Sequence, residues 1–272
     1  MHNEEQRLFF KDDNGQYRGQ DKQLLRIKVK DGDYIHPKND GQAELIARLD
    51  LGLALNIAEG DAGTGKTFIM FAHALSKELE RQQTFGKKAH GEKKKFFLVR
   101  PLLEVEEKIG HLPGTIAEKL SPSFQPFFDV LHYFFGDQIQ EAKAILGRYI
   151  ITAGGIEFEI SPLAFIRGRN IRNAYMFLDE AQNATVRQMD AFQTRAAEGT
   201  QIFVTGDTRQ CDLPRGVESG LADLLDILEH APEATGPEDD IVRVRLTEVE
   251  RAPIVKRYVA ARRARDKAKE AS

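Results

Sequence analysis

The stretch "NIAEGDAGTGKTFIM", residues 56–70, decides the fold of this chain. It contains the pattern G-x-x-x-x-G-K-[ST], which begins at Gly60 and ends at Thr67. Glycines let the backbone turn tightly enough for successive N–H groups to point at phosphate oxygens. A lysine adds positive charge on the outer phosphates, and a threonine hydroxyl can ligate Mg²⁺. The pattern therefore predicts a nucleotide-binding loop, called the phosphate loop below.

The sequences on both sides of the phosphate loop fit the setting that such a loop requires. "LALNIA", residues 53–58, has the apolar character of a buried strand. After the loop, apolar residues recur at helical spacing: Phe68, Phe71, Ala72, Leu75 and Leu79. A helix N-terminus behind the loop favours bound anions. A glycine turn before a helix is the simpler alternative, but the four fixed positions arise by chance in roughly one chain of this length in a hundred.

Two carboxylates end a second buried stretch. Asp179 and Glu180 follow "AYMFL", so one can hold the hydration shell of Mg²⁺ and the other can orient and deprotonate an attacking water. On their own they could equally begin a surface helix; beside a phosphate loop they indicate a catalytic pair.

A third run, residues 201–210, ends in G-D-x-x-Q, where Gln210 can sense a terminal phosphate. No N-K-x-D run occurs, which argues against a GTPase.

The order of these segments predicts an α/β fold. Helical patterns separate five strand candidates, residues 53–58, 96–100, 174–179, 201–206 and 241–246. Alternation of this kind predicts a mainly parallel sheet covered on both faces, with ligands at the carboxyl ends of the strands.

The composition is that of an ordinary folded protein. Of 272 residues, 41% are hydrophobic and 30% charged, which excludes disorder as the main state, and the net charge of −3 gives no global bias toward nucleic acid. A single cysteine, Cys211, excludes an internal disulfide framework and disfavours a Cys-based zinc site. The first residues lack the features of a signal peptide, and the apolar runs are too short to span a bilayer. We expect a cytoplasmic location without membrane attachment.

Four consecutive blocks resemble the motifs of the PhoH family, and the resemblance extends over about residues 38–260. They are "GDAGTGKT", "VRPLLEVEEKIGHLPG", "FIRGRNIRNAYMFLDEAQNATVRQMDAFQTR" and "VTGDTRQCDLPRGVESGL". The resemblance implies a three-layer RecA-like P-loop NTPase domain, related to superfamily-one helicases, with ATP and Mg²⁺ as cofactors.

The resemblance also implies a set of site residues. Its nucleotide-binding members are Gln42 as the adenine-reading residue and the loop residues Gly60, Asp61, Ala62, Gly63, Thr64, Gly65, Lys66 and Thr67. Its catalytic members are Lys66, Asp179, Glu180 and Gln210, with Thr67 and Asp179 on the metal. A solvated polar residue is the simpler interpretation of Gln42.

This sequence departs from the family pattern at two positions. Asp61 stands where the family usually has proline, and Glu106 replaces a small residue. A carboxylate inside a phosphate loop weakens nucleotide binding by charge repulsion unless it faces solvent or a cation.

We divide the chain into an N-terminal appendage to the sheet (1–37), a PhoH-like ATPase domain (38–255) and a basic C-terminal helix or tail (256–272).

Two segments within the domain stand out. Residues 76–95 are expected to end the first helix in a basic loop, and residues 123–149 are expected to form an aromatic-rich helical segment. Its Phe127, Phe128, Leu131 and Phe135 share one apolar face, for which core packing is the default and a subunit contact or base-stacking surface the alternative. The C-terminal basic run is either a solvated face or a nucleic-acid contact.

One nucleotide loop and one sheet leave half of a helicase-type nucleotide site uncovered. We therefore expect a homo-oligomeric ring, a hexamer by family resemblance, in which a neighbour donates Arg195 or Arg251 in trans.

Two functions fit the sequence. The first is an ATPase or helicase-like remodeller that is stimulated by single-stranded RNA, with DNA as the alternative nucleic acid. The second is a nucleotide-dependent module that recruits an endoribonuclease partner. No nuclease constellation is evident outside the ATP site.

Overall fold

The structure, a computed structural model, describes residues 8–29, 32–85, 94–101, 121–145, 148–230 and 241–270. Within them lie the strands β5 (Leu55–Gly60), β6 (Lys95–Arg100), β7 (Gln140–Ile145), β8 (Arg148–Ala153), β9 (Ile156–Pro162), β10 (Ala174–Leu178), β11 (Gln201–Gly206) and β12 (Ile241–Leu246). These form one sheet in the order β12-β5-β11-β10-β6-β9-β8-β7. The six strands from β12 to β9 are parallel, and β8 and β7 continue the sheet antiparallel.

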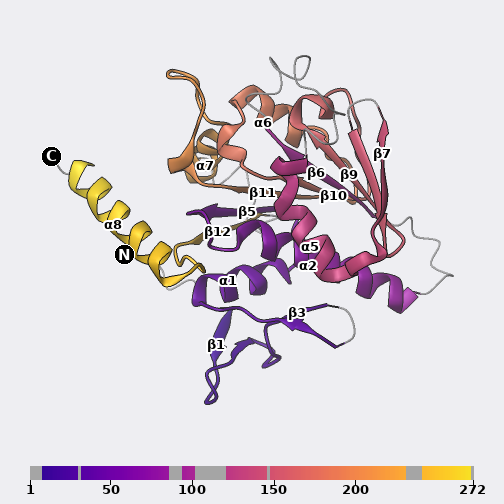
Figure 1. The fold of residues 1–272 in the computed structure, drawn as a ribbon, viewed down its shortest axis with the longest axis horizontal. Coiled ribbons are helices and arrows are strands. Elements are labelled where there is room, and N and C mark those ends of the chain that lie inside the picture. Colours follow the sequence, from indigo (N-terminus) through magenta and orange to yellow (C-terminus); the bar gives the residue numbers. More distant parts are fainter. Residues whose placement is uncertain are drawn as a thin grey trace.

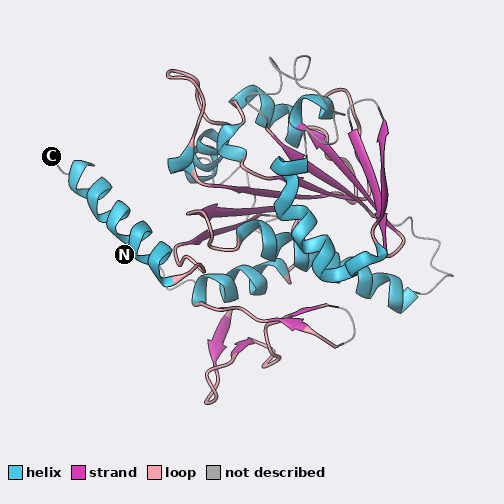
Figure 2. Cartoon of the chain, in the orientation of Figure 1, coloured by secondary structure: helices cyan, strands magenta, loops and turns pink. Residues whose placement is uncertain are grey.

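Helices cover both faces of this sheet (Figures 1 and 2). They are α1 (Asp40–Leu49), α2 (Lys66–Phe85), α5 (Gln125–Phe135), α6 (Val186–Gln193) and α7 (Gly220–His230), and a further helix, α8 (Pro253–Glu270), follows β12 without covering the sheet. The three-layer α/β fold expected from the sequence is confirmed. No helix in the described ranges has the length and apolarity needed to cross a bilayer.

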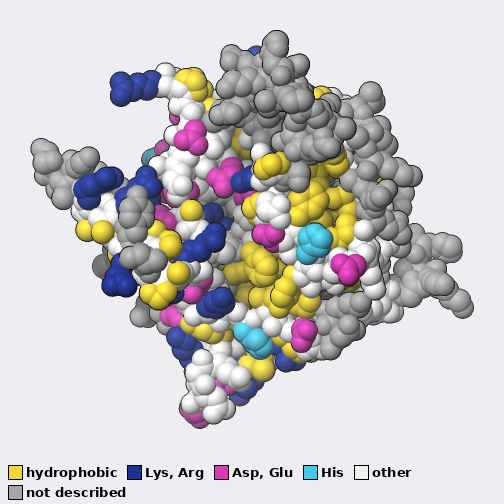
Figure 3. Space-filling view, viewed as in Figure 1, with side chains coloured by type: hydrophobic (Ala, Val, Ile, Leu, Met, Phe, Trp, Pro, Cys, Tyr) yellow, Lys and Arg dark blue, Asp and Glu magenta, His cyan; other side chains and the backbone are white. Residues whose placement is uncertain are grey.

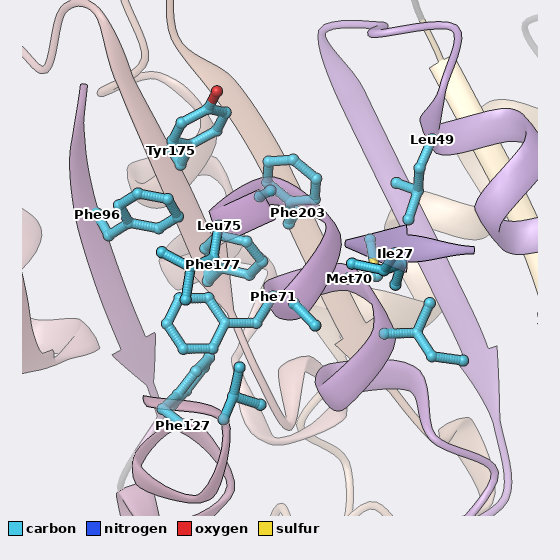
Figure 4. Packing of buried hydrophobic residues seen from close by; sticks show 14 of the residues in the cluster. Ile27, Leu49, Met70, Phe71, Leu75, Phe96, Phe127, Tyr175, Phe177 and Phe203 are labelled. Atoms are coloured by element: carbon cyan, nitrogen blue, oxygen red, sulfur yellow. The ribbon is translucent and has the colours of Figure 1, made fainter. Parts of the chain in front are cut away.

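The pleat of the strands divides the core into two clusters. On β10, Tyr175 and Phe177 face the cluster that contains α1, α2 and α5, whereas Met176 and Leu178 face α6 and α7. The first cluster is rich in aromatic rings, with Phe71 of α2 at its centre (Figure 4). Such packing fixes α2, and hence the phosphate loop before it, on the sheet.

All five strands expected from the sequence are present, although the first runs from Leu55 to Gly60 rather than from 53 to 58. The helical segment expected over residues 123–149 is wrong in its second half. Helix α5 ends at Phe135, because Gly136 adopts a φ of 53°, and strands β7 and β8 follow. The expected apolar face of α5 is confirmed as core, with Phe127, Leu131 and Phe135 buried and Phe128 partly buried.

The described N-terminal residues are separate from the main sheet, whereas the sequence suggested an appendage to it. They form two small antiparallel sheets, β1 (Phe9–Lys11) with β2 (Tyr17–Gly19) and β3 (Ile27–Lys28) with β4 (Tyr34–Ile35). Apolar side chains of this part, including Leu25 and Ile27, join the core cluster of α1 and α2. At the other end, α8 projects away from the body of the molecule (Figure 1).

Candidate nucleotide-binding site

The phosphate loop connects β5 to α2, and its glycines hold backbone conformations that other residues rarely adopt. Gly60, Gly63 and Gly65 have φ of 140°, 81° and 92°. A Cβ at Gly60 would lie 1.9 Å from the carbonyl oxygen of Leu246 in β12. The sequence pattern therefore reflects a steric requirement, and the loop opens at the carboxyl end of β5 as expected.

Lys66 is folded back onto this loop. Its Nζ donates to the carbonyl oxygens of Gly60, at 2.6 Å, and Asp61, at 2.9 Å. Burial lowers the pKa of Lys66 below its ordinary value, and nearby carboxylates offset this only in part. These two carbonyl oxygens hold the ammonium group at the loop, and phosphate oxygens can take their place as its acceptors.

Asp179 lies at the end of β10, within reach of the loop. Its Oδ1 accepts hydrogen bonds from the hydroxyls of Thr67, at 2.7 Å, and Thr205 of β11, at 2.5 Å. Its Oδ2 is buried, accepts no hydrogen bond from the described residues and lies at ion-pair distance from Arg100. A buried carboxylate beside a hydroxyl is a donor set that suits Mg²⁺.

Glu180 has a left-handed backbone, with φ of 56° and ψ of 40°. This conformation is uncommon outside glycine and often marks a functional position. Arg100, at the end of β6, contacts both acidic residues: its Nη2 lies 3.0 Å from Glu180 Oε1, and its Nε lies 3.2 Å from Asp179 Oδ2. Four parallel strands thus bring their carboxyl ends together at this site.

Gln182 links the acidic pair to residues Gly206–Gln210. Its Nε2 donates to Glu180 Oε2 at 2.6 Å, and its Oε1 accepts from the backbone N–H of Asp207 at 3.1 Å. A Cβ at Gly206 would lie 2.7 Å from the Oε1 of Gln182, so the glycine lets the Gln182 side chain pack against the end of β11. Gln210, the expected sensor, donates to Asp207 Oδ2 at 2.6 Å.

Gln42 packs directly on the phosphate loop. Its Nε2 donates to the carbonyl oxygen of Thr64 at 2.9 Å, and its Oε1 accepts from the backbone N–H of Lys38 at 3.0 Å. The residue is 5% exposed, so it is not the solvated side chain of the simpler interpretation. The structure brings it to the loop; its contact with adenine stays a prediction.

Asp61, the departure from the family pattern, faces a cation. Its Oδ1 accepts from Nη2 of Arg209, which lies between Asp207 and Gln210. Asp61 is buried, and the guanidinium of Arg209 neutralises the negative charge that would otherwise repel the nucleotide.

The two candidate arginines lie at different places. Arg251 lies against the phosphate loop of its own chain, since a Cβ at Gly63 would be 2.8 Å from its Cγ and from its Nε. The backbone N–H of Glu250 also donates to the carbonyl oxygen of Gly63 at 2.8 Å. Arg195 follows α6, and its carbonyl oxygen accepts from Ile171, before the start of β10. Arg195 is therefore at the opposite end of β10 from the acidic pair.

Some expected features lie outside the described residues, namely Glu106 and residues 86–93 of the basic loop. Of the lysines next to that loop, Lys95 pairs with Glu157 at 2.8 Å, and Lys94 lies over the ring of Tyr175.

Comparison with known proteins identifies the family. A family profile described as "PhoH-like protein" matches residues 34–262. The chain belongs to the PhoH family. It is 37% identical over 227 residues to a PhoH-like protein of Mycobacterium bovis, 38% over 200 residues to Protein PhoH of Escherichia coli K12 and 37% over 238 residues to a PhoH-like protein of Bacillus subtilis.

These matches cover 82%, 74% and 85% of the PhoH-family chain but 58%, 51% and 64% of the three relatives, so the chain spans little more than half of their length. Among solved structures it resembles the large terminase of a thermophilic bacteriophage, with a TM-score of 0.49 and 16% identity over 82% of this chain and 50% of that one. The family and the phosphate loop together mark this chain as an ATPase-like nucleotide-binding protein.

Sequence reasoning missed four residues of the site: Arg100, Gln182, Thr205 and Arg209. A polar residue at the carboxyl end of a predicted parallel strand was the available signal, and it applies to Arg100 and Thr205. Gln182 and Arg209 lie in short turns next to expected residues, but nothing in the sequence tells where those turns point.

Proposed function

We propose that the chain hydrolyses ATP at this site. The observation that carries the proposal is the joining of Thr67, Asp179 and Thr205 by hydrogen bonds at the mouth of the phosphate loop, with Glu180 beside them. Thr67 and Asp179 would hold Mg²⁺, which would supply charge neutralisation on the phosphates. The remaining ligands of this ion would be waters and phosphate oxygens.

The residues of the site then have separate roles. Lys66 exchanges its two carbonyl contacts for phosphate oxygens. Glu180 leaves Arg100, orients the attacking water and takes its proton. Arg251, lying across Gly63, neutralises charge on the transferred phosphoryl group within its own chain.

We further propose single-stranded RNA as the activator of hydrolysis. The support is helix α8, which projects from the body of the molecule (Figure 1) and carries the exposed Arg257, Arg262 and Arg265. Lys and Arg side chains gather on this side of the molecule (Figure 3). Arginines along one exposed helix suit a phosphate backbone. Lys94 and Lys95 support this role less, because one is partly buried and the other is paired.

A second candidate is a nucleotide-dependent switch that recruits an endoribonuclease. The observation that favours it is the bridge that Gln182 makes between Glu180 and Asp207, through which a movement of Glu180 would reach residues 207–210 and the largely exposed stretch 211–219. Such a stretch can present a surface that depends on the bound nucleotide.

Steady-state ATP hydrolysis with and without single-stranded RNA tests the two candidates. Stimulation of about tenfold or more, with single-stranded DNA as the comparison, supports the RNA-dependent ATPase. Slow turnover that neither nucleic acid changes contradicts it and favours the switch. A hexameric ring stays a proposal based on family resemblance. The contact of Arg251 with its own phosphate loop supports an arginine that acts within the chain rather than one donated by a neighbour.

A further inference from the structure

A cavity lies at the amino ends of the central strands, opposite to the nucleotide site at their carboxyl ends. It has a volume of about 590 Å³ and is lined by the start of β5, β10 and β11, the end of α1 and the middle of α2. Because β5 has six residues, the cavity and the phosphate loop lie about 20 Å apart along that strand. Cavities of this size accommodate small organic ligands.

One wall of the cavity is cationic. Lys77 lies 2.8 Å from Asp50, which also contacts His73 at 3.1 Å. Lys94 has its Nζ 4.7 Å from the centre of the Tyr175 ring. The nearby carboxylate Glu78 is paired with Arg81 at 2.8 Å, so the wall carries two lysines of which Asp50 pairs with one.

A second wall carries an unused acceptor. Asn56 is 1% exposed; its Nδ2 donates to the carbonyl oxygens of Leu53, at 3.0 Å, and Ile202, at 3.3 Å. Its Oδ1 is buried without a hydrogen-bond partner among the described residues. Buried polar atoms in native proteins are rarely left without a partner, so an acceptor in the wall of a cavity indicates a donor that comes from outside the chain.

The remaining lining contains an apolar and aromatic part beside polar residues such as Thr200 and Gln201. Leu49, Ala74 and Phe203 line the cavity, and the rings of Tyr175 and Phe203 lie 6.2 Å apart at its base. The Tyr175 hydroxyl points away from the aromatic cluster of the core (Figure 4). Burial and the nearby Glu78 raise the pKa of that phenol, so it remains a neutral hydrogen-bond donor.

We propose that this cavity binds a small organic anion: a carboxylate or phosphate group between Lys77 and Lys94, on an aromatic body that carries a hydroxyl or amino donor toward Asn56. The lysines recognise the anion, Phe203 and Ala74 contact the body, and the donor satisfies Oδ1. This site is separate from the nucleotide site and does not depend on ATP hydrolysis.

The test is isothermal titration calorimetry of the full chain with 4-hydroxybenzoate and with 4-hydroxyphenyl phosphate, which share the ring and the hydroxyl donor and differ in the anion. Inorganic phosphate lacks the aromatic body and phenol lacks the charge, so both should bind about tenfold more weakly or worse. We expect a Kd of about 1 mM for the better probe, a value ordinary for ligands of about ten heavy atoms.

Lys94→Met should weaken binding about tenfold or more, while Lys11→Met, a surface change on the N-terminal appendage, should leave it unchanged. Ala74→Leu fills the cavity without changing charge and should abolish binding; circular dichroism melting confirms that each variant is folded. The proposal is overturned if neither probe binds at about 10 mM, if Lys94→Met and Ala74→Leu bind like the wild type, or if Lys66→Ala alone removes binding, since the anion would then lie in the phosphate loop.

Discussion

At the scale of single residues, the site depends on carboxylates whose oxygens have different partners. Asp179 uses Oδ1 to hold two hydroxyls, and its neighbour Glu180 is held by Arg100 and Gln182 in a left-handed backbone. Both acids are therefore fixed, but the side chain of Glu180 is 46% exposed whereas Asp179 is buried, which is why the water-activating role is proposed for Glu180.

The first prediction separates binding from chemistry. Glu180→Gln should lower kcat for ATP about a hundredfold or more while the Kd for ATP changes less than about threefold, because the metal ligand Asp179 is intact. Lys66→Ala should abolish turnover and also weaken ATP binding. Stopped-flow binding of a fluorescent ATP analogue and phosphate release measure the two quantities. Glu198→Gln, an exposed carboxylate, is the control; equal loss of binding in both site variants would show that the roles are wrong.

The second prediction concerns the pair of Asp61 and Arg209. Arg209→Gln should raise the Kd for ATP about tenfold, or about 1.4 kcal/mol, because the carboxylate in the loop then repels the phosphates. Asp61→Asn should bind ATP at least as tightly as the wild type, and the double variant should bind ATP as tightly as Asp61→Asn. Titration of all four proteins gives the coupling energy. Additive effects would mean that Arg209 acts on the nucleotide directly.

At the scale of elements, the junction of β5 with the phosphate loop is the most constrained point. Gly60 pairs with Leu246 of β12, and its absent side chain is what lets the two strand ends approach. The loop conformation thus depends on a strand that is distant in sequence.

The third prediction follows from this contact. Gly60→Ala should lower the free energy of unfolding by about 3 kcal/mol, since it adds a clash with β12 to an unfavourable backbone conformation. Gly52→Ala, before the same strand, has φ of 72° with nothing within 4 Å of the added Cβ, so it should cost only about 1 kcal/mol. Urea denaturation compares the two. Equal losses would indicate that the contact with Leu246 is relieved by a small shift of β12.

At the scale of the whole molecule, the two ends of the chain differ in how they are attached. The N-terminal appendage shares the core of α1 and α2, whereas α8 extends from the body with exposed basic side chains. The residues just before α8 nevertheless reach the phosphate loop, through Glu250 and Arg251.

The fourth prediction tests α8 as an RNA contact. Replacing Arg257, Arg262 and Arg265 by glutamine should reduce the slope of log K against log salt for single-stranded RNA by about 2, at about 0.7 per phosphate contact. Arg167, Arg172 and Arg187 are exposed elsewhere, so their replacement by glutamine should leave the slope unchanged. Fluorescence anisotropy over a range of about 50 to 300 mM salt gives both slopes. An unaltered slope in the first variant would remove α8 from the interface.

The fifth prediction asks in which chain Arg251 acts. Because it lies on its own phosphate loop, a mixture of Lys66→Ala and Arg251→Ala chains should stay inactive, and specific activity should not depend on protein concentration. ATP hydrolysis of the mixture, across a range of concentrations, measures both. Regained activity would support the ring with a donated arginine, and the same mixture with Arg195→Ala tests the second candidate.

The sequence by itself determined the family, the α/β class, the phosphate loop and the acidic pair. Each depends on neighbours in sequence: glycine spacing, an apolar run and the residues that end it. Lys66, Thr67, Asp179 and Glu180 were predictable for this reason, and the structure brings them to one edge of the sheet.

Only the tertiary structure decided which distant residues complete the site. Arg100 reaches the acidic pair because β6 lies beside β10, and Arg209 meets Asp61 because β11 lies beside β5. Arg251 and Arg195 look alike in the sequence, yet one lies on the phosphate loop and the other at the far end of β10. Strand order and the direction of helices set these distances, and both arise from packing of the whole core rather than from local patterns.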